Sequence, residues 1–508
     1  MAIIGKLLQQ TAAYTYKLTA NKGVEYKYQL EVLRKLLSQA KNTKFGLVHN
    51  FHTILLKQDA VSEYQENVPI TDYEEFYKMW LQESIEGAKD HTWRGKIKFY
   101  ALSSGTTGSP SKRIPVTQEM IRSFQRTSLR QFSIIHELDL PEVFFGSSLL
   151  TVGGSTKLTT VGKHVEGDLS GILRKHASLV VMPFTKPGKK ITDLKTWNEK
   201  LEAILPIAPS WNIGIIAGIP SWCILLMEKL IDHYQLNSIH DIWPNLQVYV
   251  HGGVFMEPYI DRLQKISSKP IFLLDTYLAS EGYFAYQVST SRTGMKLLLN
   301  NGIFFEFIPF NWHYFDENGD LKNKHEALTI SQVEVGVDYA IVISTNAGLW
   351  RYLIGDLVRF IDIEEREIII SGRIKQFLSL CGEHLSLDNI NQALLHVGTK
   401  HQTLFSEFTI FADYDELRHY WYLGSDKEVD TEQFTKELDA ELCLLNDDYA
   451  YVRKYNLQEP KIQVIAPTLF YDFLDWLGKS GGQSKMPRVL NKEQSIKWCE
   501  FLKDKAIG

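Results

Sequence analysis

The sequence contains few cysteines. Cys223, Cys381, Cys443 and Cys499 are the four in 508 residues, and no two of them have the spacing of metal ligands. Four thiols in so long a chain do not make a disulfide framework, so we expect a reducing compartment. The 15 histidines are scattered and no His-Glu-x-x-His pattern occurs, so no zinc site is predicted.

An excess of charge of one sign is also lacking. Lysine and arginine number 55 and aspartate and glutamate number 60, which gives a formal net charge of −5. This balance offers no basis for bulk electrostatic binding to nucleic acid or to an anionic membrane. Hydrophobic residues make up 44% and charged residues 23% of the chain, which excludes a disordered or fibrous protein.

Long hydrophobic runs are absent too. The most apolar stretch, Trp211–Met227, is interrupted by asparagine, glycine and proline, whereas a membrane span needs about 20 apolar residues. We interpret this stretch as a buried strand (Ile213–Ala217), a turn (Gly218–Ser221) and a helix that starts near Trp222. Residues 1–5 are too few for a secretory signal, and we expect an N-terminal amphipathic helix there. The sequence therefore predicts a cytoplasmic protein without a membrane partner.

Strand and helix patterns alternate after a helical N-terminal part. Residues 1–95 are expected to be mostly helical, because Tyr28–Gln39 and Asp72–Ile85 carry apolar residues at three- and four-residue steps. Short apolar runs then alternate with helical patterns, and this order is typical of an α/β fold with a largely parallel sheet. The expected strands are Leu179–Phe184, Gly214–Ala217, Leu246–Val250 and Pro270–Leu274, and the helices between them include Leu194–Ile204 and Pro258–Ile266.

Strand patterns dominate after about residue 295. Leu297–Leu299 and Ile303–Ile308 flank the residues Asn-Asn-Gly, which is a hairpin signal. With further short apolar runs, this predicts a small antiparallel sheet or β-barrel-like part. The further expected strands are Val333–Val335, Tyr339–Ser344, Leu357–Ile361 and Glu367–Ser371.

The C-terminal part mixes helices and strands. Beyond Arg373 we expect a smaller α+β domain over residues 374–508, joined by a short hinge to a large domain over residues 1–373. The expected elements are helices at Leu387–His396 and Thr431–Leu445 and strands at Glu407–Ala412 and His419–Leu423.

A segment of small and hydroxyl residues follows the apolar run Ile97–Leu102. Small residues let the backbone approach an anion, and consecutive N–H groups form an anion-binding concavity. It is not a Walker A loop, because Ser111 precedes Lys112 and Arg113 follows it. Composition alone leaves a plain surface loop as the alternative. The segment consists of Ser103, Ser104, Gly105, Thr106, Thr107, Gly108, Ser109, Pro110, Ser111 and Lys112.

Three later segments also combine small residues with a polar group beside an apolar strand. They are His251–Gly253, Tyr277–Gly282 and Arg351–Asp356. Ligands collect at the carboxyl ends of the strands in α/β sheets. Each segment alone has a structural explanation: Glu281 at a helix N-terminus, Asp356 capping a turn, and the two glycines forming a tight turn.

Taken together, these segments resemble the three nucleotide motifs of adenylate-forming enzymes in their order and spacing. More narrowly, the chain resembles the auxin-responsive acyl-acid amido synthetase family, also called the Gretchen Hagen family, over nearly its whole length. Further matching segments are Gly218–Trp222, Phe304–Pro309, Ala347–Tyr352 and Gly481–Arg488.

This resemblance implies a large N-terminal adenylate-forming domain and a mobile C-terminal domain that closes over the active site. It also implies a ligase reaction that uses ATP and Mg²⁺. A small carboxylic acid attacks the α-phosphate of ATP to give an acyl-adenylate and pyrophosphate. The amine of an amino acid then attacks the acyl carbon, which gives an amide and AMP.

The resemblance also implies roles for individual residues. Lys112, Glu281 and Lys485 are expected to be catalytic, with Glu281 holding Mg²⁺ and Lys485 entering the site when the C-terminal domain closes. For Lys485, a solvated loop lysine is the alternative. Phosphate contacts are expected from Ser103, Ser104, Gly105, Thr106 and Thr107, and contacts to the rest of the nucleotide from His251, Gly252, Gly253, Tyr277, Ser280, Asp356 and Arg373.

Several positions depart from the plant members of the family. Leu353 stands where arginine is expected, Pro110 lies in the phosphate loop, and His384 stands where plant enzymes carry a lysine near the hinge. These departures indicate a non-plant branch, so neither the acid nor the amino acid is identified. The walls expected for the acid pocket are Leu149–Gly154 and Gly218–Trp222.

Two alternatives remain beside the amide ligase. An acyl-coenzyme A ligase uses the same adenylation step, and a catalytically inactive homologue binds the nucleotide only. A hydrolase is not expected, because Gly478–Gly482 fits the G-x-S-x-G pattern without the strand–turn–helix context that exposes a nucleophile.

Overall fold

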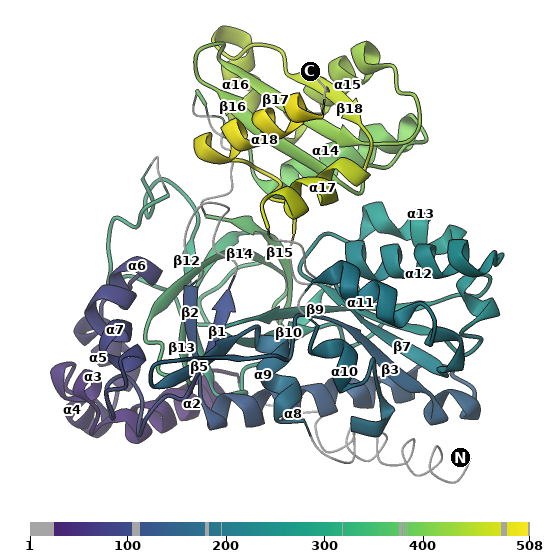
Figure 1. Ribbon diagram of the computed structural model, residues 1–508. Helices are drawn as coiled ribbons and strands as arrows, with labels where there is room; N and C mark the ends of the chain where they lie inside the picture. The colour runs from purple at the N-terminus through teal and green to yellow at the C-terminus, as the bar shows by residue number, and fades with distance from the viewer. Residues whose placement is uncertain are drawn as a thin grey trace.

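The computed structural model describes residues 25–103, 112–177, 182–194, 196–316, 319–374, 378, 380–381, 383, 385–478 and 485–505 (Figure 1). The first described part is helical, as expected for this region; the predicted N-terminal amphipathic helix lies outside the described residues. The elements are α2 (Glu25–Ala40), α3 (Lys44–Val48), α4 (Phe51–Leu56), α5 (Ala60–Asn67), α6 (Tyr73–Phe76), the π-helical η1 (Tyr77–Leu81) and α7 (Gln82–Ile85).

A large mixed sheet forms the centre of the molecule. Its strand order is β12-β13-β14-β15-β11-β10-β9-β8-β7-β3-β6. Strands β6, β3, β7, β8 and β9 pair in parallel, and the remaining pairs are antiparallel. The strands are β3 (Ser148–Val152), β6 (Thr185–Lys186), β7 (Ile213–Gly218), β8 (Val248–Gly252), β9 (Phe272–Ala279), β10 (Gly282–Tyr286), β11 (Met295–Leu297), β12 (Ile303–Pro309), β13 (Asp338–Thr345), β14 (Tyr352–Asp362) and β15 (Glu367–Arg373).

Two hydrophobic cores cover the opposite faces of the parallel half of this sheet. Val248 and Tyr249 are neighbours in β8 but belong to different cores, because successive side chains of a strand point to opposite faces. Residues of α11 (Trp197–Ile204), α12 (Pro220–Tyr234) and α13 (Glu257–Lys265) join Tyr249. The C-terminal end of α8 (Gln118–Ile134) and the turns after it join Val248. This layered arrangement confirms the predicted α/β fold class.

A smaller sheet carries the start of the hydroxyl-rich segment. Its strand order is β2-β1-β5-β4. Ser103 at the end of β1 pairs with Lys112 at the start of β2, so the undescribed residues 104–111 connect these two antiparallel strands. The strands are β1 (Phe99–Ser103), β2 (Lys112–Val116), β4 (Thr159–Val161) and β5 (His164–Gly167).

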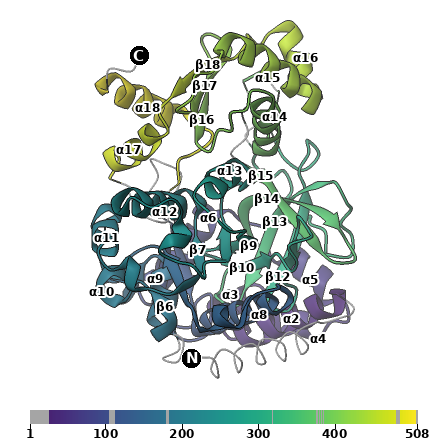
Figure 2. The same cartoon turned by 90° about the vertical axis from the view of Figure 1, so that its right-hand side faces the viewer.

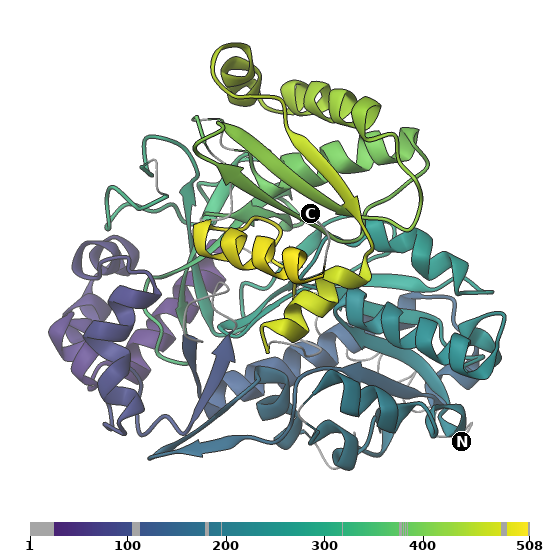
Figure 3. The same ribbon diagram turned by 45° about the horizontal axis from the view of Figure 1, so that its top comes forward.

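Residues 385–478 and 485–505 form a separate layer above the carboxyl ends of the parallel strands (Figures 1 and 2). Helices cover both faces of its three-stranded sheet, β16-β17-β18 (Figure 3). One core contains residues of α14, α15 and α16, and the other contains residues of α17 and α18. The elements are β16 (Phe408–Asp413), β17 (Arg418–Gly424), β18 (Lys461–Ile465), α14 (Leu387–Lys400), α15 (Thr431–Leu445), α16 (Asp447–Tyr455), α17 (Thr468–Trp476) and α18 (Lys492–Asp504).

Several predicted strands need correction. The prediction of a hairpin between Leu297–Leu299 and Ile303–Ile308 is wrong, because these two segments do not pair with each other. Strand β11 pairs with β10 and β15, whereas β12 pairs with β13. The expected strand Val333–Val335 is reduced to a single bridge between Val335 and Phe360. Of the run Leu179–Phe184, residues 179–181 lie outside the described residues, and the rest is a 3-10 turn before the two-residue β6.

The expected barrel-like part is not a separate unit. Its strands continue the parallel strands in one sheet, and the described residues contain no closed barrel. Among the same residues, no helix is both long and apolar enough to cross a membrane.

Candidate active site

A cavity of about 2380 Å³ lies between the carboxyl ends of the parallel strands and the C-terminal layer. Strands β7, β8 and β9 end at this cavity, and residues 485–492 line it from the opposite side. Of the expected site residues, Ser104, Gly105, Thr106, Thr107 and His384 lie outside the described residues. The cavity lining includes Ser103, Lys112, His251, Gly252, Gly253, Tyr277, Ser280, Glu281, Asp356, Arg373 and Lys485.

Two glycines at the end of β8 expose their backbone to the cavity. A Cβ on Gly252 would lie 2.3 Å from the carbonyl oxygen of Thr276, so no side chain fits there. Gly253 has φ of +82°, in the left-handed region that glycine favours. The alternative interpretation as a simple tight turn does not fit Gly252, which is the last residue of the strand. The result is a strand end without side chains of its own, and Lys485 Nζ lies 2.3 Å from the position that a Cβ on Gly253 would take.

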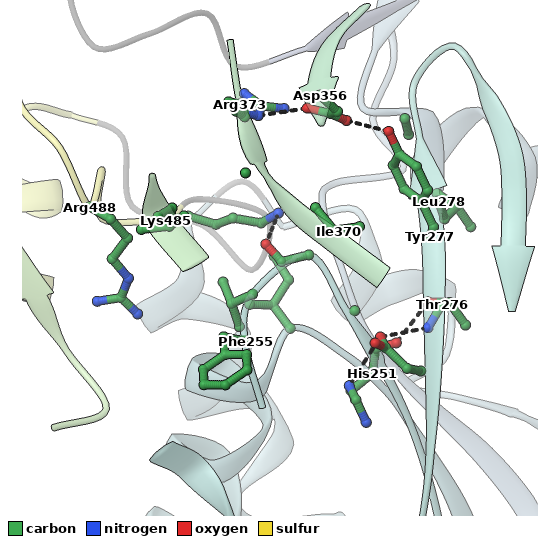
Figure 4. Close-up of a pocket in the computed structure, with 18 of the residues that line it drawn as sticks. His251, Phe255, Thr276, Tyr277, Leu278, Asp356, Ile370, Arg373, Lys485 and Arg488 are labelled. Carbon is green, nitrogen blue, oxygen red and sulfur yellow. Dashed lines mark hydrogen bonds and ion pairs between the residues drawn. The ribbon is translucent and has the colours of Figure 1, made fainter. Parts of the chain in front are cut away.

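A triad of Tyr277, Asp356 and Arg373 connects three strands across the cavity through one hydrogen bond and one ion pair. The Tyr277 hydroxyl donates to Asp356 Oδ2 at 2.6 Å, and Arg373 Nε lies 2.8 Å from Asp356 Oδ1. Asp356 and Arg373 face each other because they are paired residues of β14 and β15 (Figure 4). Burial and the carboxylate of Asp356 raise the pKa of Tyr277, which therefore stays a neutral donor. Each carboxylate oxygen keeps a lone pair for a further donor.

Glu281 places a buried carboxyl group beside the triad. It lies in the turn between β9 and β10, not at a helix N-terminus as one interpretation of the sequence has it, and its exposed fraction is 6%. Burial raises its pKa, and the positive charge of Lys112 opposes this effect. The Tyr352 hydroxyl lies 3.5 Å from Glu281 Oε1. A carboxyl group in this position favours a cationic partner inside the cavity.

Two lysines approach the cavity from different parts of the chain. Lys112 begins β2, and its Nζ lies 5.3 Å from the centre of the Tyr73 ring. Lys485 comes from the C-terminal layer and donates from Nζ to the carbonyl oxygen of Gly253 at 2.8 Å (Figure 4). The surrounding protein and the charge of Arg373 lower the pKa of Lys485 to about 8. Lys485 therefore lines the cavity, and the residue as a whole is exposed.

Sequence reasoning missed an acidic residue in the floor of the cavity. Asp275 lies in β9, and burial raises its pKa to about 7. His251 Nδ1 lies 3.4 Å from Asp275 Oδ1, and burial lowers the pKa of His251 to about 4, so this imidazole is neutral. The sequence does contain a signal for this residue. Asp275 is a charged residue that directly follows the apolar run Phe272–Leu274 within a strand.

The expected walls of the acid pocket are only partly at the cavity. Leu149, Thr151 and Gly153 of the first segment and Gly218 and Ile219 of the second line it. Trp222 does not contribute, because it is 2% exposed and belongs to the core around α12. The helix α12 begins at Pro220, two residues before the expected start, and this turns the indole into the core.

Two segments of the family pattern meet in the core instead of the site. Arg351 and Glu306 are fully buried, and Arg351 Nη2 lies 2.9 Å from Glu306 Oε1. Arg351 also donates to the carbonyl oxygens of Gln65 and Val68. This pair holds β12 and the start of β14 to the N-terminal helices, so its role is structural.

Comparison with known proteins gives matches to three family models. They are the GH3 family N-terminal domain at residues 25–201, the central domain at residues 296–367 and the C-terminal domain at residues 388–494. Indole-3-acetic acid-amido synthetase GH3.4 of Arabidopsis thaliana is 27% identical over 282 residues, which cover 50% of this chain and 45% of that relative. Jasmonoyl–L-amino acid synthetase JAR6 of Nicotiana attenuata is 23% identical over 395 residues, which cover 66% of each. The chain thus spans about half to two thirds of the length of these curated relatives.

Solved structures show the same fold. A structure of GH3.15 acyl acid amido synthetase superposes with a TM-score of 0.76 at 17% identity and covers 99% of this chain and 96% of that chain. A structure of 2-hydroxyisobutyryl-CoA ligase in the postadenylation state superposes with a TM-score of 0.58 at 12% identity and covers 94% and 91%.

Proposed function

Because this chain belongs to the GH3 family, we propose that it uses ATP to join a small carboxylic acid to the amine of an amino acid. The observation that carries this proposal is the convergence of separated segments on one cavity. Lys112, Glu281, Asp356 and Lys485 come from four regions of the chain and line the same space. Their donors and charges suit a nucleotide and a reacting carboxylate.

In the first step, the acid oxygen attacks the α-phosphorus of ATP and pyrophosphate leaves. The protein positions the reactants and stabilises the negative charge at phosphorus. Lys112 and Lys485 supply positive charge, and the hydroxyl segment that begins at Ser103 supplies donors to the departing phosphates. The free lone pairs of Asp356 accept the ribose hydroxyls, while Arg373 and Tyr277 hold this carboxylate in place.

Glu281 is the residue that we propose to hold Mg²⁺. Magnesium is commonly bound by one or two carboxylates together with substrate phosphates and water, and the buried carboxyl group of Glu281 fits this donor set. The ion would neutralise charge across the phosphates. The described residues contain no cluster of three or more histidine, cysteine or acidic side chains that would hold a metal without substrate.

In the second step, the unprotonated amine attacks the acyl carbon of the adenylate and AMP leaves. The released proton passes to the AMP phosphate or to water. We propose that residues 374–508 move as one body against residues 1–373 between the two steps, because their cores are largely separate. All four cysteines are free thiols, which fits the cytoplasm as the proposed location.

The test is a product analysis by mass spectrometry. The protein is incubated with ATP, Mg²⁺, a panel of small carboxylic acids, a mixture of amino acids and coenzyme A. We expect an acyl amino acid and AMP, both lost in a Glu281→Ala variant. A coenzyme A thioester instead would favour the second candidate, an acyl-CoA ligase, which the fold of 2-hydroxyisobutyryl-CoA ligase supports. An acyl-adenylate that never reaches an acceptor would reject both.

A further inference from the structure

A buried polar cluster joins the C-terminal layer to helix α13. At its centre is Glu407, just before β16, whose side chain is 4% exposed. Its Oε1 accepts hydrogen bonds from the hydroxyls of Tyr259 at 2.6 Å and Tyr471 at 3.0 Å. Its Oε2 lies 3.0 Å from Arg488 Nη1. Glu407 is not among the residues that line the cavity.

Arg488 makes further hydrogen bonds around Glu407. Its Nη2 donates to the Tyr259 hydroxyl at 3.2 Å and to the carbonyl oxygen of Ser406 at 2.9 Å. Its Nη1 also donates to the carbonyl oxygen of Phe408 at 3.1 Å, and the guanidinium lies 4.6 Å from the centre of the Phe408 ring. A guanidinium with this many partners has one defined position.

The same short segment carries Lys485. It runs beside β16, since Ile410 N donates to Arg488 O at 2.9 Å and Leu490 N donates to Ile410 O at 2.8 Å. Lys485 and Arg488 point in different directions from it, with Lys485 directed to Gly253 in the cavity (Figure 4). Fixing Arg488 therefore fixes the starting point of the Lys485 side chain.

Tyr259 is the member of the cluster that comes from the large N-terminal part. Glu407, Tyr471 and Arg488 all belong to the C-terminal layer and stay together if this layer moves. Arg262 in α13 adds a second link, from Nη1 to Ser406 Oγ at 3.2 Å. A rotation of the layer away from α13 thus removes the Tyr259 hydrogen bonds from a buried ion pair.

We propose that Tyr259, Glu407 and Arg488 form an interdomain latch that positions Lys485 for adenylation. The latch holds the C-terminal layer in the orientation in which Lys485 reaches Gly253. It rests on the proposed function in that adenylation is the step that needs Lys485. Amide formation from an adenylate already in the cavity does not need the latch. All three residues act through Lys485 and are positioning residues.

The test separates the two half-reactions in a Tyr259→Phe variant. This change keeps the ring and removes the hydroxyl that Glu407 and Arg488 share. We expect acid-dependent exchange of pyrophosphate into ATP to fall about 10-fold, because a hydrogen bond to a charged group is lost. Amide formation in a single turnover, from a supplied acyl-adenylate of an acid that the wild type activates, stays within about 2-fold.

The matched control is Tyr234→Phe. The Tyr234 hydroxyl donates to the carbonyl oxygen of Leu205 at 2.8 Å, within the large N-terminal part. This variant also loses one tyrosine hydrogen bond, and we expect both half-reactions to stay unchanged. A second latch variant, Glu407→Gln, keeps the shape of the side chain and should reduce exchange of pyrophosphate at least as much as Tyr259→Phe.

Amide hydrogen exchange separates failure of the latch from failure of the proposed function. Peptides that cover residues 486–490 should exchange faster in Tyr259→Phe than in wild type or Tyr234→Phe, whether or not the protein turns over. Unchanged exchange at these residues, or an equal loss in both half-reactions, would overturn the latch. The two failures can be told apart. If Tyr259→Phe exchanges faster but the wild type shows no adenylation, the latch is supported and the proposed reaction is rejected.

Discussion

The charge of the Lys485 amine should make the activity of the cavity depend on pH. Its pKa lies at about 8, below the ordinary value for lysine of about 10.4, because of the surrounding protein and the charge of Arg373. The amine is charged below pH 8 and becomes neutral above it. If the charged form assists adenylation, kcat/KM for ATP falls as pH rises through about 8.

The measurement is a pH profile of pyrophosphate exchange for wild type and Lys485→Arg. Arginine stays charged over this range, so the variant should lose the decline near pH 8 even if its rate is lower. The same decline in both proteins would assign it to another group. Lys485→Ala should lower exchange at every pH.

The hydroxyl of Tyr277 gives a second prediction at this scale. Tyr277→Phe removes the 2.6 Å hydrogen bond to Asp356 and leaves one buried carboxylate oxygen with fewer donors. We expect the affinity for ATP, measured by calorimetry, to fall about tenfold and the free energy of unfolding to fall by about 1–3 kcal/mol. Tyr64→Phe is the control, because the buried Tyr64 hydroxyl bonds Ser344 at 2.7 Å away from the cavity. It should lose stability and keep its affinity; equal affinities in the two variants would contradict the assigned role.

Single residues could be recognised from the sequence, but their partners could not. Asp356 and Arg373 both stand out in the motif pattern, yet their 2.8 Å pair depends on the register of β14 and β15. Arg351 belongs to a site motif by sequence, whereas the fold buries it against Glu306. Asp275 escaped notice because nothing local shows which face of β9 meets the cavity.

At the scale of the element, the close approach of Lys485 to the backbone at the end of β8 can be tested by substitution of Gly253. A Cβ on Gly253 would lie 2.3 Å from Lys485 Nζ, and the residue has φ of +82°. Gly253→Ala should displace Lys485, lower pyrophosphate exchange and cost about 1 kcal/mol of stability. Gly336 has φ of +84° with no atom near its Cβ position, so Gly336→Ala should show the stability cost alone. Equal exchange rates for both variants would show that Lys485 does not need this approach.

The buried ion pair between Arg351 and Glu306 at the start of β14 is expected to stabilise the core. Arg351→Met leaves the fully buried Glu306 without its charged partner, and we expect a loss of about 3–5 kcal/mol in the free energy of unfolding. Arg359→Met is the comparison, since Arg359 pairs with Asp338 at 2.9 Å but is 28% exposed; its cost should stay near 1 kcal/mol or below. Urea unfolding measures the free energy of unfolding of both variants. Similar losses in the two variants would contradict the structural role of Arg351.

Local patterns predict elements better than they predict pairing. The helix at Thr431–Leu445 has the predicted bounds, and its N-terminus is capped by the Asp430 side chain. The hairpin signal near residue 300 is misleading, because Asn301 donates to the carbonyl oxygen of Tyr283 and Gly302 accepts from Asn346 N. Contacts distant in sequence therefore decide which strands become neighbours.

At the scale of the whole molecule, the site exists only where distant parts meet. The cavity has walls from the parallel strands, from β14 and β15, and from residues 485–492. The sequence order of the motifs predicts that such a site exists, whereas its closure by the C-terminal layer depends on the Tyr259, Glu407 and Arg488 latch. In the proposed mechanism, the C-terminal layer brings Lys485 to the cavity for adenylation and withdraws it for amide formation.

The central claim is that these segments bind one ATP. A calorimetric titration of the folded chain with ATP and Mg²⁺ tests it most directly, with an Asp356→Ala variant titrated in parallel. The account predicts one ATP per chain in the wild type and a loss of affinity of tenfold or more, about 1.4 kcal/mol, in the variant. No binding to the folded wild type, or equal affinity in both proteins, would contradict it.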